Sequence, residues 1–343
     1  MNSAPLKAEI HAEPTLRLVT SVDEVASLDA VWQALLARSE CHPVFSSHAW
    51  YMAAITCFVD VSPRVLVLSQ QGEVCGIAPL VWDAGTEHLR LASDLADYQD
   101  FIVPADSLDL ARQLLDTILT SGAGISASET RRLHLAGLRQ NAVVTRLMGK
   151  AITRNLAQQE CWYADLSAGY DAFLATRSSN FRYNLRRAQR RAERSDVRVG
   201  ESRPDQLAPE QLPELFLRLH LQRFPDKLFS RAEPQAFCRA LLPGLFTRGL
   251  LRAFVIKQRS TTVGLHLTVQ GRHSLAIWNG GFDASIATLS PGKLLLDYQF
   301  KTVCRERLIA YDFLRGDESY KRSWSTHHVK IGGFDYATLA TGR

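Results

Sequence analysis

The sequence lacks the features that mark membrane spans, secretion and disulfide scaffolds. None of the apolar runs among its 343 residues reaches the roughly 18 residues that a bilayer span needs. The first residues, MNSAPLKAEIHAEP, do not have the basic-then-apolar pattern of a secretion signal. Six cysteines are scattered without a Cys-x-x-Cys pair, so neither a zinc site nor a disulfide framework is indicated. We therefore expect a soluble, cytoplasmic protein.

Metal-binding patterns are missing as well. No two histidines stand at ligand spacing together with a carboxylate. The adjacent His327 and His328 point in different directions in any regular structure, so they do not form a pair of ligands. We therefore expect chemistry without a metal cofactor.

The chain does have the composition of a globular enzyme, and its charge is uneven. A hydrophobic content of 46% is ordinary, and the length exceeds the usual size of one core, which predicts two domains. Residues 1–160 carry 12 Lys+Arg against 18 Asp+Glu, and the remaining residues carry 28 against 17. The two parts therefore have formal charges of −6 and +11, which places any anion site in the second part.

The order of predicted helices and strands repeats along the chain. The first copy has amphipathic segments at 25–36 and 48–58, strands at 64–70, 73–82, 88–93, 100–103 and 133–138, and a helix near 108–120. The second has helices near 171–194, 209–223 and 233–247, strands at 197–200, 250–258, 263–270, 274–281 and 310–314, and a helix from 291. We predict a flexible segment 1–15, a first lobe 16–157 and a second lobe 158–343.

The start of the helix at 291 is a candidate cofactor site. Ser290 can cap a helix whose first residue is Pro291, and Gly292 lets the backbone come close to a ligand. The free amides and the positive end of the helix dipole would face an anion, which Lys293 also favours. We predict that Ser290, Pro291, Gly292 and Lys293 hold a phosphate-bearing cofactor. The alternative is an ordinary capped helix start with a solvated lysine.

A cluster of charged residues follows the strand at 310–314. Asp312 lies in the apolar run IAYDFL, where a charge is costly unless it is paired or functional. It is either a catalytic carboxylate or half of a buried ion pair with Arg315 or Lys321, and beside such cations it would stay ionised. Asp317 and Glu318 lie in a more polar segment, where either one can be the base or a substrate clamp.

Four further residues are candidates for the walls of the site, and a histidine is a candidate base. His266 lies on the opposite face of its strand from the apolar residues, so it is either catalytic or a satisfied structural histidine. His220 and Arg223 lie about one helical turn apart and share a face. Trp278 and Asn279 end the preceding strand, where they either line a pocket or pack and cap.

The segment from Arg177 to Arg198 contains eight arginines. Arg182, Arg186, Arg190 and Arg194 share one helix face, whereas the buried face is expected to consist of Phe181, Leu185, Ala188 and Ala192. The arginines can bind a nucleic acid, an anionic saccharide precursor or a lipid phosphate. No aromatic residues interleave the stripe for base stacking, so a solvated basic face remains an alternative.

The sequence resembles the GNAT-type acyltransferases of the BioF2-like or CelD-like group, which is associated with polysaccharide or cellulose synthesis and is distantly FemAB-like. The resemblance rests on SPGKLLL (290–296) and YDFLRGDESYKRSW (311–324), supported by PVFSSHAW, LADYQDFIV, LHLAGLRQ, SSNFRYNLRRAQRRAE and LHLQRF in this order. Two positions depart from the group: Phe224 stands in place of a tryptophan, and WNGGFD (278–283) replaces a tyrosine-led version.

The resemblance implies a mixed α/β fold with two tandem GNAT-like lobes, each a twisted mixed sheet flanked by helices. It also implies an acyl-CoA-dependent acyltransferase that acts on a small-molecule or saccharide amine or hydroxyl. Acetyl-CoA or another acyl-CoA would bind at Ser290–Lys293, and the first lobe would lack a cofactor. The catalytic residue would be Asp312, Asp317 or His266. The substrate would be bound by His220, Arg223, Trp278, Asn279, Arg315 and Lys321. The alternatives are an aminoacyl-tRNA-dependent transferase and a non-catalytic accessory protein of exopolysaccharide assembly.

Overall fold

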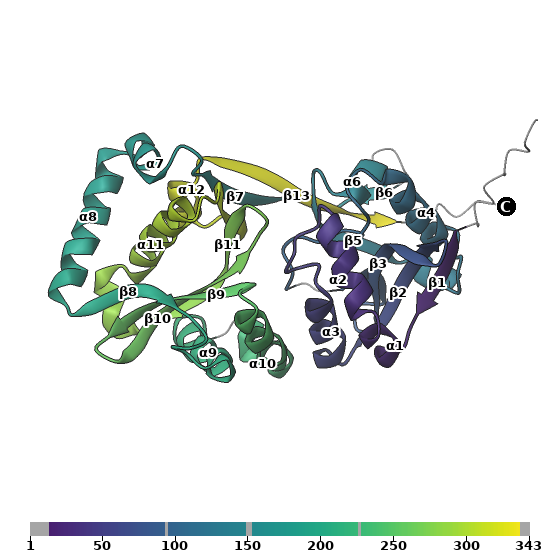
Figure 1. Cartoon of the computed structure of the whole chain (residues 1–343), viewed down its shortest axis with the longest axis horizontal. Helices are drawn as coiled ribbons and strands as arrows, with labels where there is room; N and C mark the ends of the chain where they lie inside the picture. The colour runs from purple at the N-terminus through teal and green to yellow at the C-terminus, as the bar shows by residue number, and fades with distance from the viewer. Residues whose placement is uncertain (1–13, 93–94, 149–152, 226–227, 337–343) are drawn as a thin grey trace, which may run out of the picture.

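The computed structural model of the chain describes residues 14–92, 95–148, 153–225 and 228–336. Residues 1–13 of the predicted flexible segment 1–15 lie outside this part. Two lobes lie side by side, and each consists of strands with helices on both faces (Figure 1). The predicted fold class, a mixed α/β fold with two lobes built on twisted mixed sheets, is confirmed.

The first lobe begins with short helices on one face of the sheet and continues with a meander of strands. Its elements are β1 (Thr15–Val19), α1 (Val22–Ala26), α2 (Asp29–Arg38), α3 (His48–Cys57), β2 (Val61–Gln70), β3 (Glu73–Asp83), β4 (His88–Leu91), α4 (Leu108–Leu119), α5 (Ala127–Thr130), β5 (Leu133–Arg139), α6 (Val143–Met148) and β6 (Thr153–Asn155). The amphipathic segment expected at 25–36 thus forms parts of two helices, which separate at Ser27 and Leu28.

The second lobe repeats this order with longer helices. Its elements are β7 (Gln159–Asp165), α7 (Tyr170–Thr176), α8 (Ser179–Arg194), β8 (Val197–Ser202), η1 (Pro209–Gln211), α9 (Leu212–Arg223), η2 (Leu228–Ser230), α10 (Ala232–Thr247), β9 (Leu251–Gln258), β10 (Thr261–Gln270), β11 (Ser274–Phe282), η3 (Ala284–Leu289), α11 (Pro291–Arg305), β12 (Ala310–Arg315), α12 (Ser319–Trp324) and β13 (His327–Tyr336).

The pattern of antiparallel and parallel strand pairs is the same from both ends of the sheet. Within the described ranges, the main path is β1-β2-β3-β4-β5-β13-β7-β12-β11-β10-β9-β8, and β6 pairs with β13. From either end, three antiparallel pairs precede one parallel pair, which is β4–β5 in the first lobe and β11–β12 in the second. This repetition is the structural counterpart of the repeated element order in the sequence.

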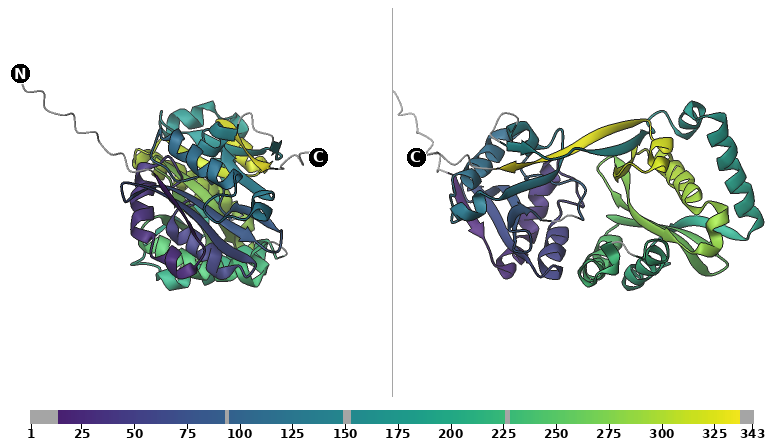
Figure 2. Two further views of the ribbon diagram at one scale, coloured as in Figure 1. Left: turned by 90° about the vertical axis from the view of Figure 1, so that its right-hand side faces the viewer. Right: turned by 180° about the vertical axis from the view of Figure 1, so that it is seen from behind.

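Strand β13 joins the two lobes. His327–Ile331 pair with β7 of the second lobe, and Ile331–Tyr336 pair with β5 of the first. Figures 1 and 2 show β13 as the long strand that runs between the lobes. The sequence analysis placed no strand after 314, and it expected two sheets side by side. Instead the two sheets are continuous, because a strand late in the chain completes the first lobe.

The lobes also share a hydrophobic core. The ring of Trp50 on α3 lies 5.3 Å from Phe237 of α10 and 5.6 Å from Trp278 of β11, measured between ring centroids. Trp50, Phe237 and Trp278 belong to one buried cluster with residues of both lobes. Aromatic pairs of this kind contribute about 0.5–1.5 kcal/mol each beyond the burial of their area. The core therefore holds the lobes in one relative position.

Two further local predictions differ from the structure. The helix expected over 171–194 is broken at Arg177, because the Ser178 hydroxyl accepts a hydrogen bond from the Phe181 amide and begins a new helix, α8. The strand expected at 100–103 is reduced to a single bridge between Ile77 and Ile102.

Candidate active site

The candidate cofactor site lies where α11 begins. The helix starts at Pro291 as predicted, but the predicted side-chain cap is wrong, because Ser290 has a left-handed backbone (φ 59°) and its hydroxyl makes no capping bond. Its carbonyl instead accepts hydrogen bonds from Lys293 (3.0 Å) and Leu294 (3.3 Å). A Cβ atom added at Gly292 would meet no heavy atom within 4 Å. The backbone at Gly292 is therefore open to a ligand.

A cavity of about 450 Å³ adjoins this helix start. Its size lies within the usual range for ligand pockets. It is lined from α8, from the residues around the α7–α8 junction, from the first turn of α11 and from α12, by residues that include Arg177, Asn180, Asn184, Lys293 and Arg322. Three cationic side chains and an open helix start thus surround one space, which suits a ligand with phosphate groups.

The cations around this cavity differ in how they are held. The Arg177 guanidinium donates a hydrogen bond to the Ser325 carbonyl (2.7 Å) and lies 4.9 Å from the Phe173 ring centroid. Arg322 forms an ion pair with Asp317, a predicted catalytic residue. This pair lowers the pKa of Asp317, which is exposed. Lys293 is exposed and forms no ion pair within the described part of the chain, so it remains available to an anion.

The predicted catalytic residue Asp312 lies on β12, where the strand bulges away from β7 between Asp312 and Arg315. Its carboxylate accepts hydrogen bonds from the Leu314 amide (2.7 Å) and from the Tyr98 hydroxyl (3.0 and 2.8 Å to its two oxygens). Leu314, which is buried, has a left-handed backbone (φ 57°). Strain of this kind in a bulky residue is concentrated at functional sites.

The expected ion pair of Asp312 with Arg315 or Lys321 is wrong. Arg315 binds Asp97 of the first lobe, with 2.9 Å between Nε and Oδ1, and Lys321 is buried beside Glu318 (3.1 Å). Asp312 is therefore surrounded chiefly by neutral donors, and burial raises its pKa to about 6 against the opposing hydrogen bonds from Leu314 and Tyr98. A carboxyl group of this pKa is closer to a general base than to the ionised partner of Arg315 or Lys321 that the sequence also allowed.

The ladder between β11 and β12 is short. Their parallel pairing covers Ser274–Ala276 and Ala310–Asp312, after which β11 continues beside β10 and β12 turns beside β7. The two strands therefore diverge between the start of α11 and the carboxylate of Asp312. A strand edge of this kind can bind an extended ligand through its backbone groups.

His266 faces α11 and belongs to a buried polar group. Its Nδ1 lies 3.3 Å from Oε1 of Gln299, which also accepts a hydrogen bond from the Tyr311 hydroxyl (2.6 Å). Burial lowers the pKa of His266 to about 4, so the ring is neutral at pH 7. A Cβ atom at Gly280 would lie 2.6 Å from the ring, so the histidine fills the space beside β11. His266 contacts Gln299, Asp312 contacts Tyr98 and Asp317 contacts Arg322, so the three predicted catalytic residues share no contact partner among these bonds.

The predicted wall residues lie along β11. The His220 Nδ1 is 3.0 Å from the Gly280 carbonyl, and the Arg223 guanidinium lies 4.4 Å from the Phe282 ring centroid. The Trp278 indole donates to the Leu95 carbonyl of the first lobe (3.3 Å), and the half-buried Asn279 pairs with Leu267 of β10. The structure thus brings His220, Arg223, Trp278 and Asn279 onto or beside one strand.

Helix α8 presents arginines to solvent on the side of the second lobe farthest from the first (Figure 1). Leu185, Ala188 and Ala192 are buried as predicted, and Phe181 packs against Trp324. Arg182 differs from the expected stripe, because it turns back and donates to carbonyls at the end of α7. The exposed arginines of the helix are Arg186, Arg187, Arg190, Arg191 and Arg194.

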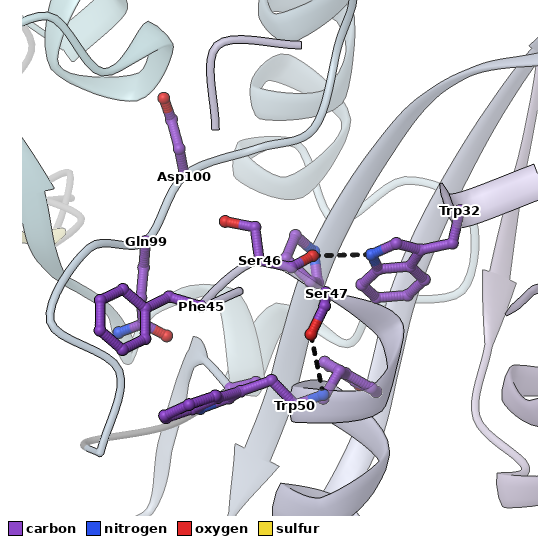
Figure 3. Close-up of a pocket in the computed structure, with 10 residues that line it drawn as sticks. Trp32, Phe45, Ser46, Ser47, Trp50, Gln99 and Asp100 are labelled. Atoms are coloured by element: carbon purple, nitrogen blue, oxygen red, sulfur yellow. Dashed lines mark hydrogen bonds between the residues drawn. The ribbon is translucent and has the colours of Figure 1, made fainter. Parts of the chain in front are cut away.

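The first lobe contains a much smaller pocket, drawn in Figure 3. Its volume is about 20 Å³, which is enough for one water molecule. Trp32 donates from its indole to the Ser46 carbonyl (2.8 Å), and the Trp50 amide donates to the Ser47 hydroxyl (3.2 Å), so the walls are bonded to each other (Figure 3). This pocket has no room for a cofactor.

Two features are absent from the residues that the structure describes. In ranges 14–92, 95–148, 153–225 and 228–336, no three or more His, Cys, Asp or Glu residues are grouped so that they could hold a metal ion. Over the same ranges, no helix has the length and apolar character that a membrane crossing requires.

The sequence analysis missed Asp97 and Tyr98 as site residues. Both lie in the first lobe, more than 200 positions before the side chains that they contact. They stand within LADYQDFIV, one of the runs that carry the family resemblance. The signal was therefore present, but no sequence spacing relates this run to the strand at 310–314.

Comparisons with known proteins agree with this architecture. Residues 179–322 match the family model described as "Acetyltransferase (GNAT) domain". These residues include α8, the start of α11 and Asp312. No curated protein matches the sequence. The match to the GNAT family model thus lies within the second lobe.

Solved structures resemble the whole chain and not only this domain. FemX has a TM-score of 0.65 at 12% identity, with 95% of this chain and 98% of that chain covered. L-PGS from Bacillus licheniformis has a TM-score of 0.60 at 14% identity, covering 89% and 90%. A tandem GNAT protein from the clavulanic acid biosynthesis pathway has a TM-score of 0.52 at 9% identity, covering 95% and 100%. At these identities the likeness concerns the fold, and it supports two GNAT lobes.

Proposed function

We propose that this chain, whose second lobe matches a GNAT family model, is an acyl-CoA-dependent acyltransferase that acylates an amine or hydroxyl of a small-molecule or saccharide acceptor. The observation that carries the proposal is the basic cavity of about 450 Å³ at the open start of α11. Under this proposal the first lobe binds no cofactor and shapes the acceptor side. As in the CelD-like group, a role in polysaccharide or cell-envelope synthesis would follow.

The donor would bind through its phosphates. Lys293 and Arg177 would neutralise the diphosphate, and the amides of the first turn of α11 would bind its oxygens across Gly292. The pantetheine arm is an extended amide chain, and it would lie along the edge of β11 where β12 diverges. His220, Arg223, Trp278 and Asn279 line or flank that strand, so they would form the walls around the thioester.

The chemistry would be direct attack without a covalent enzyme intermediate. The acceptor nitrogen or oxygen forms a bond to the thioester carbonyl carbon, and the carbon–sulfur bond breaks with its electron pair remaining on sulfur. The proton of the acceptor goes to the Asp312 carboxylate, and the coenzyme A thiolate takes a proton from solvent. Arg315, which is bound to Asp97, and the buried Lys321 would shape the acceptor side beside Asp312.

Among the three predicted catalytic residues, Asp312 fits the base best. With a pKa of about 6, it is ionised at neutral pH and still basic enough to accept a proton. Asp317 is exposed and its pKa is lowered by Arg322, and His266 has a pKa of about 4. Both are weaker bases than Asp312, so Asp317 would hold Arg322 at the cavity and His266 would support β11.

Calorimetric titration with acetyl-CoA and longer acyl-CoAs tests the proposal. The wild type is expected to bind, whereas Gly292→Asp, which places a carboxylate where the diphosphate would lie, is expected to bind at least 50-fold more weakly, about 2.3 kcal/mol. Gly200→Asp is a matched control, because a Cβ atom there also meets no heavy atom within 4 Å but lies on β8. A folded wild type that binds none of these thioesters would overturn the proposal.

The second candidate is a transferase that uses aminoacyl-tRNA, as the FemAB-like resemblance implies. The exposed arginines of α8 favour it, because they can neutralise phosphates along a polynucleotide. Binding of tRNA would then weaken steeply with salt, and Arg186→Ala/Arg190→Ala would reduce the salt dependence. A protein that binds an anionic saccharide through α8 and has no affinity for either donor would instead be the accessory protein of exopolysaccharide assembly.

A further inference from the structure

A loop of the first lobe reaches the candidate base of the second. Tyr98 donates its hydroxyl to both oxygens of Asp312, at 3.0 and 2.8 Å. The residues around it are bound on three sides: Leu95 accepts from the Trp278 indole (3.3 Å), Asp97 binds Arg315 (2.9 Å), and the Gln99 amide donates to the Gly137 carbonyl (2.9 Å). The loop is therefore fixed to both lobes at once.

The ring of Tyr98 is also held in place. Only 5% of the residue is exposed. The Phe45 ring meets it edge to face at 6.1 Å between centroids, and the Arg139 guanidinium lies 5.3 Å from its centroid. Burial and the neighbouring Asp312 raise the pKa of the Tyr98 phenol well above its ordinary value. The hydroxyl thus keeps its proton at neutral pH and can donate it to the carboxylate.

Other charged and titratable groups surround the carboxyl of Asp312. Asp97 on the same loop raises the pKa of Asp312, whereas Arg139 on β5 lowers it. Cys161 on β7 is buried with a pKa of about 12, so it is a neutral thiol. On β12 itself, Arg315 is bound to Asp97. Since the more distant charges oppose each other, the direct donors Tyr98 and Leu314 decide how the carboxylate is oriented.

We propose that Tyr98 is a positioning residue for acyl transfer, whose hydroxyl holds the Asp312 carboxylate in the orientation from which it takes the acceptor's proton. The inference rests on the proposed function of Asp312 as general base. A carboxylate has about four lone-pair sites, so the donors Tyr98 and Leu314 leave room for the acceptor. The active site is then a product of both lobes, since the first lobe supplies the group that aligns the base of the second.

Tyr98→Phe tests this role, because it removes the hydroxyl and keeps the ring. The loss of a donor to the charged form is expected to raise the pKa of Asp312 by about one pH unit or more. The carboxyl carbon of Asp312 is followed by NMR in protein labelled with ¹³C-aspartate, and Asp312→Asn identifies its signal. In parallel, release of free thiol from acetyl-CoA is measured against pH, with glucosamine as the acceptor probe.

The kinetic expectation follows from the ionised fraction of the carboxyl group. At pH 6, Tyr98→Phe is expected to lower kcat/KM about fivefold more than at pH 8.5, where both carboxyl groups are ionised and only the loss of orientation lowers the rate. Tyr51→Phe is the matched control: its buried hydroxyl donates to the Leu80 carbonyl (2.7 Å) in the first lobe and touches no carboxylate. Tyr51→Phe is expected to lose stability, but its kcat/KM should fall at low pH with the same apparent pKa as in the wild type.

The two arms separate failure of the inference from failure of the proposed function. An unchanged Asp312 titration in Tyr98→Phe overturns the inference, as does a loss of rate that is equal at all pH values and shared by Tyr51→Phe. A wild type that neither binds nor cleaves acetyl-CoA overturns the proposed function. In that case a shifted Asp312 titration in Tyr98→Phe shows only that the two side chains are in contact, and the role of Tyr98 in acyl transfer is overturned as well.

Discussion

The two lobes have the same strand pairing but differ at the bulged strand. The pairing of β5 with β13 skips Gly137, and the pairing of β12 with β7 skips Phe313 and Leu314, so each of these strands bulges at one place. Both Gly137 and Leu314 have a left-handed backbone, with φ of 72° and 57°. Glycine adopts this conformation freely, whereas other residues lose roughly 1–2 kcal/mol. The left-handed position is thus common to both lobes, and the second lobe adds backbone strain and the half-buried carboxyl group of Asp312.

The lobes also differ in the segment that follows β4 in the first lobe and β11 in the second. In the second lobe, β11 leads through η3 to the open start of α11 and the large cavity. In the first lobe, β4 leads into a longer segment that carries Asp97 and Tyr98 to the other lobe before α4 begins. The second lobe therefore has space for a ligand, and the first lobe contributes side-chain contacts to the candidate site of the second.

The largest expected effect concerns Asp312 on β12, compared with the buried Leu135 on β5 of the first lobe. Asp312→Asn is expected to lower kcat/KM by about 10²–10⁴, the usual contribution of a general base, while the protein stays folded. Leu135→Ala, at a fully buried site, is expected to cost about 2–5 kcal/mol of unfolding free energy and to change kcat/KM of the folded protein little. Thiol release and urea unfolding of both variants measure this; equal losses of rate in the two would remove the proposed distinction between the lobes.

The stability of the second lobe is expected to fall as pH rises from about 4 to 6. Asp312 has a pKa of about 6 in the folded protein against an ordinary value of 3.8, so the folded state binds a proton more tightly in this window. Asp312→Asn removes this penalty, and it is expected to be more stable than wild type by up to about 3 kcal/mol above pH 7 and equal to it below pH 4.

Urea unfolding at pH 3.5 and pH 8 measures this difference. Asp100 in the first lobe also has a pKa of about 6, but it is present in both proteins and cancels. A gain in stability that is the same at both pH values would show that ionisation of Asp312 is not its source.

Gly137 provides a smaller test of the backbone comparison. Gly137→Ala adds a Cβ atom 3.3 Å from the Asp97 carbonyl at a left-handed position, and it is expected to cost about 1–2 kcal/mol. Because the Gln99 amide binds the Gly137 carbonyl, the loop with Tyr98 should loosen as well. Amide hydrogen exchange at Gln99 is expected to speed up in this variant, and unchanged exchange with unchanged stability would contradict the strain assigned to this position.

The smallest expected effect concerns the cavity. Lys293→Ala is expected to weaken acetyl-CoA binding about five- to tenfold, roughly 1–1.4 kcal/mol, and to reduce its salt dependence, because the lysine is exposed and screened. Arg231→Ala is the control, since this exposed arginine lies before α10 and away from the cavity. If both variants bind like the wild type, the phosphates do not lie beside Lys293.

The local elements could be predicted from the sequence because they follow short-range patterns. Pro291 and Gly292 mark the start of α11, and alternation reveals β9, β10 and β11. Strand β13 was missed, since HHVKIGGFDY has no strict alternation and contains two glycines. Both ladders of β13 are long-range contacts that no local pattern encodes. The left-handed Ser290 was likewise hidden, because serine before a helix ordinarily predicts a capping side chain.

The candidate site was predictable only in part, for the same reason. The sequence identified Asp312, Arg315 and Lys321 as a cluster and assumed that neighbours in sequence would pair. In the folded protein, Arg315 pairs with Asp97 and Asp312 with Tyr98, so the electrostatics of the site depend on the packing of the other lobe. The pKa of Asp312 could not be inferred without that packing.

The course of β13 has a consequence for synthesis of the protein. Chains fold as they leave the ribosome, and N-terminal domains usually fold first. Here β5 lacks its antiparallel neighbour until residues 327–336 have emerged, so nearly all of the second lobe is translated while one edge of the first stays open. Open edges recruit wrong partners, including the β13 of another copy. We therefore expect the nascent first lobe to depend on chaperones, and chains shortened before residue 327 to aggregate.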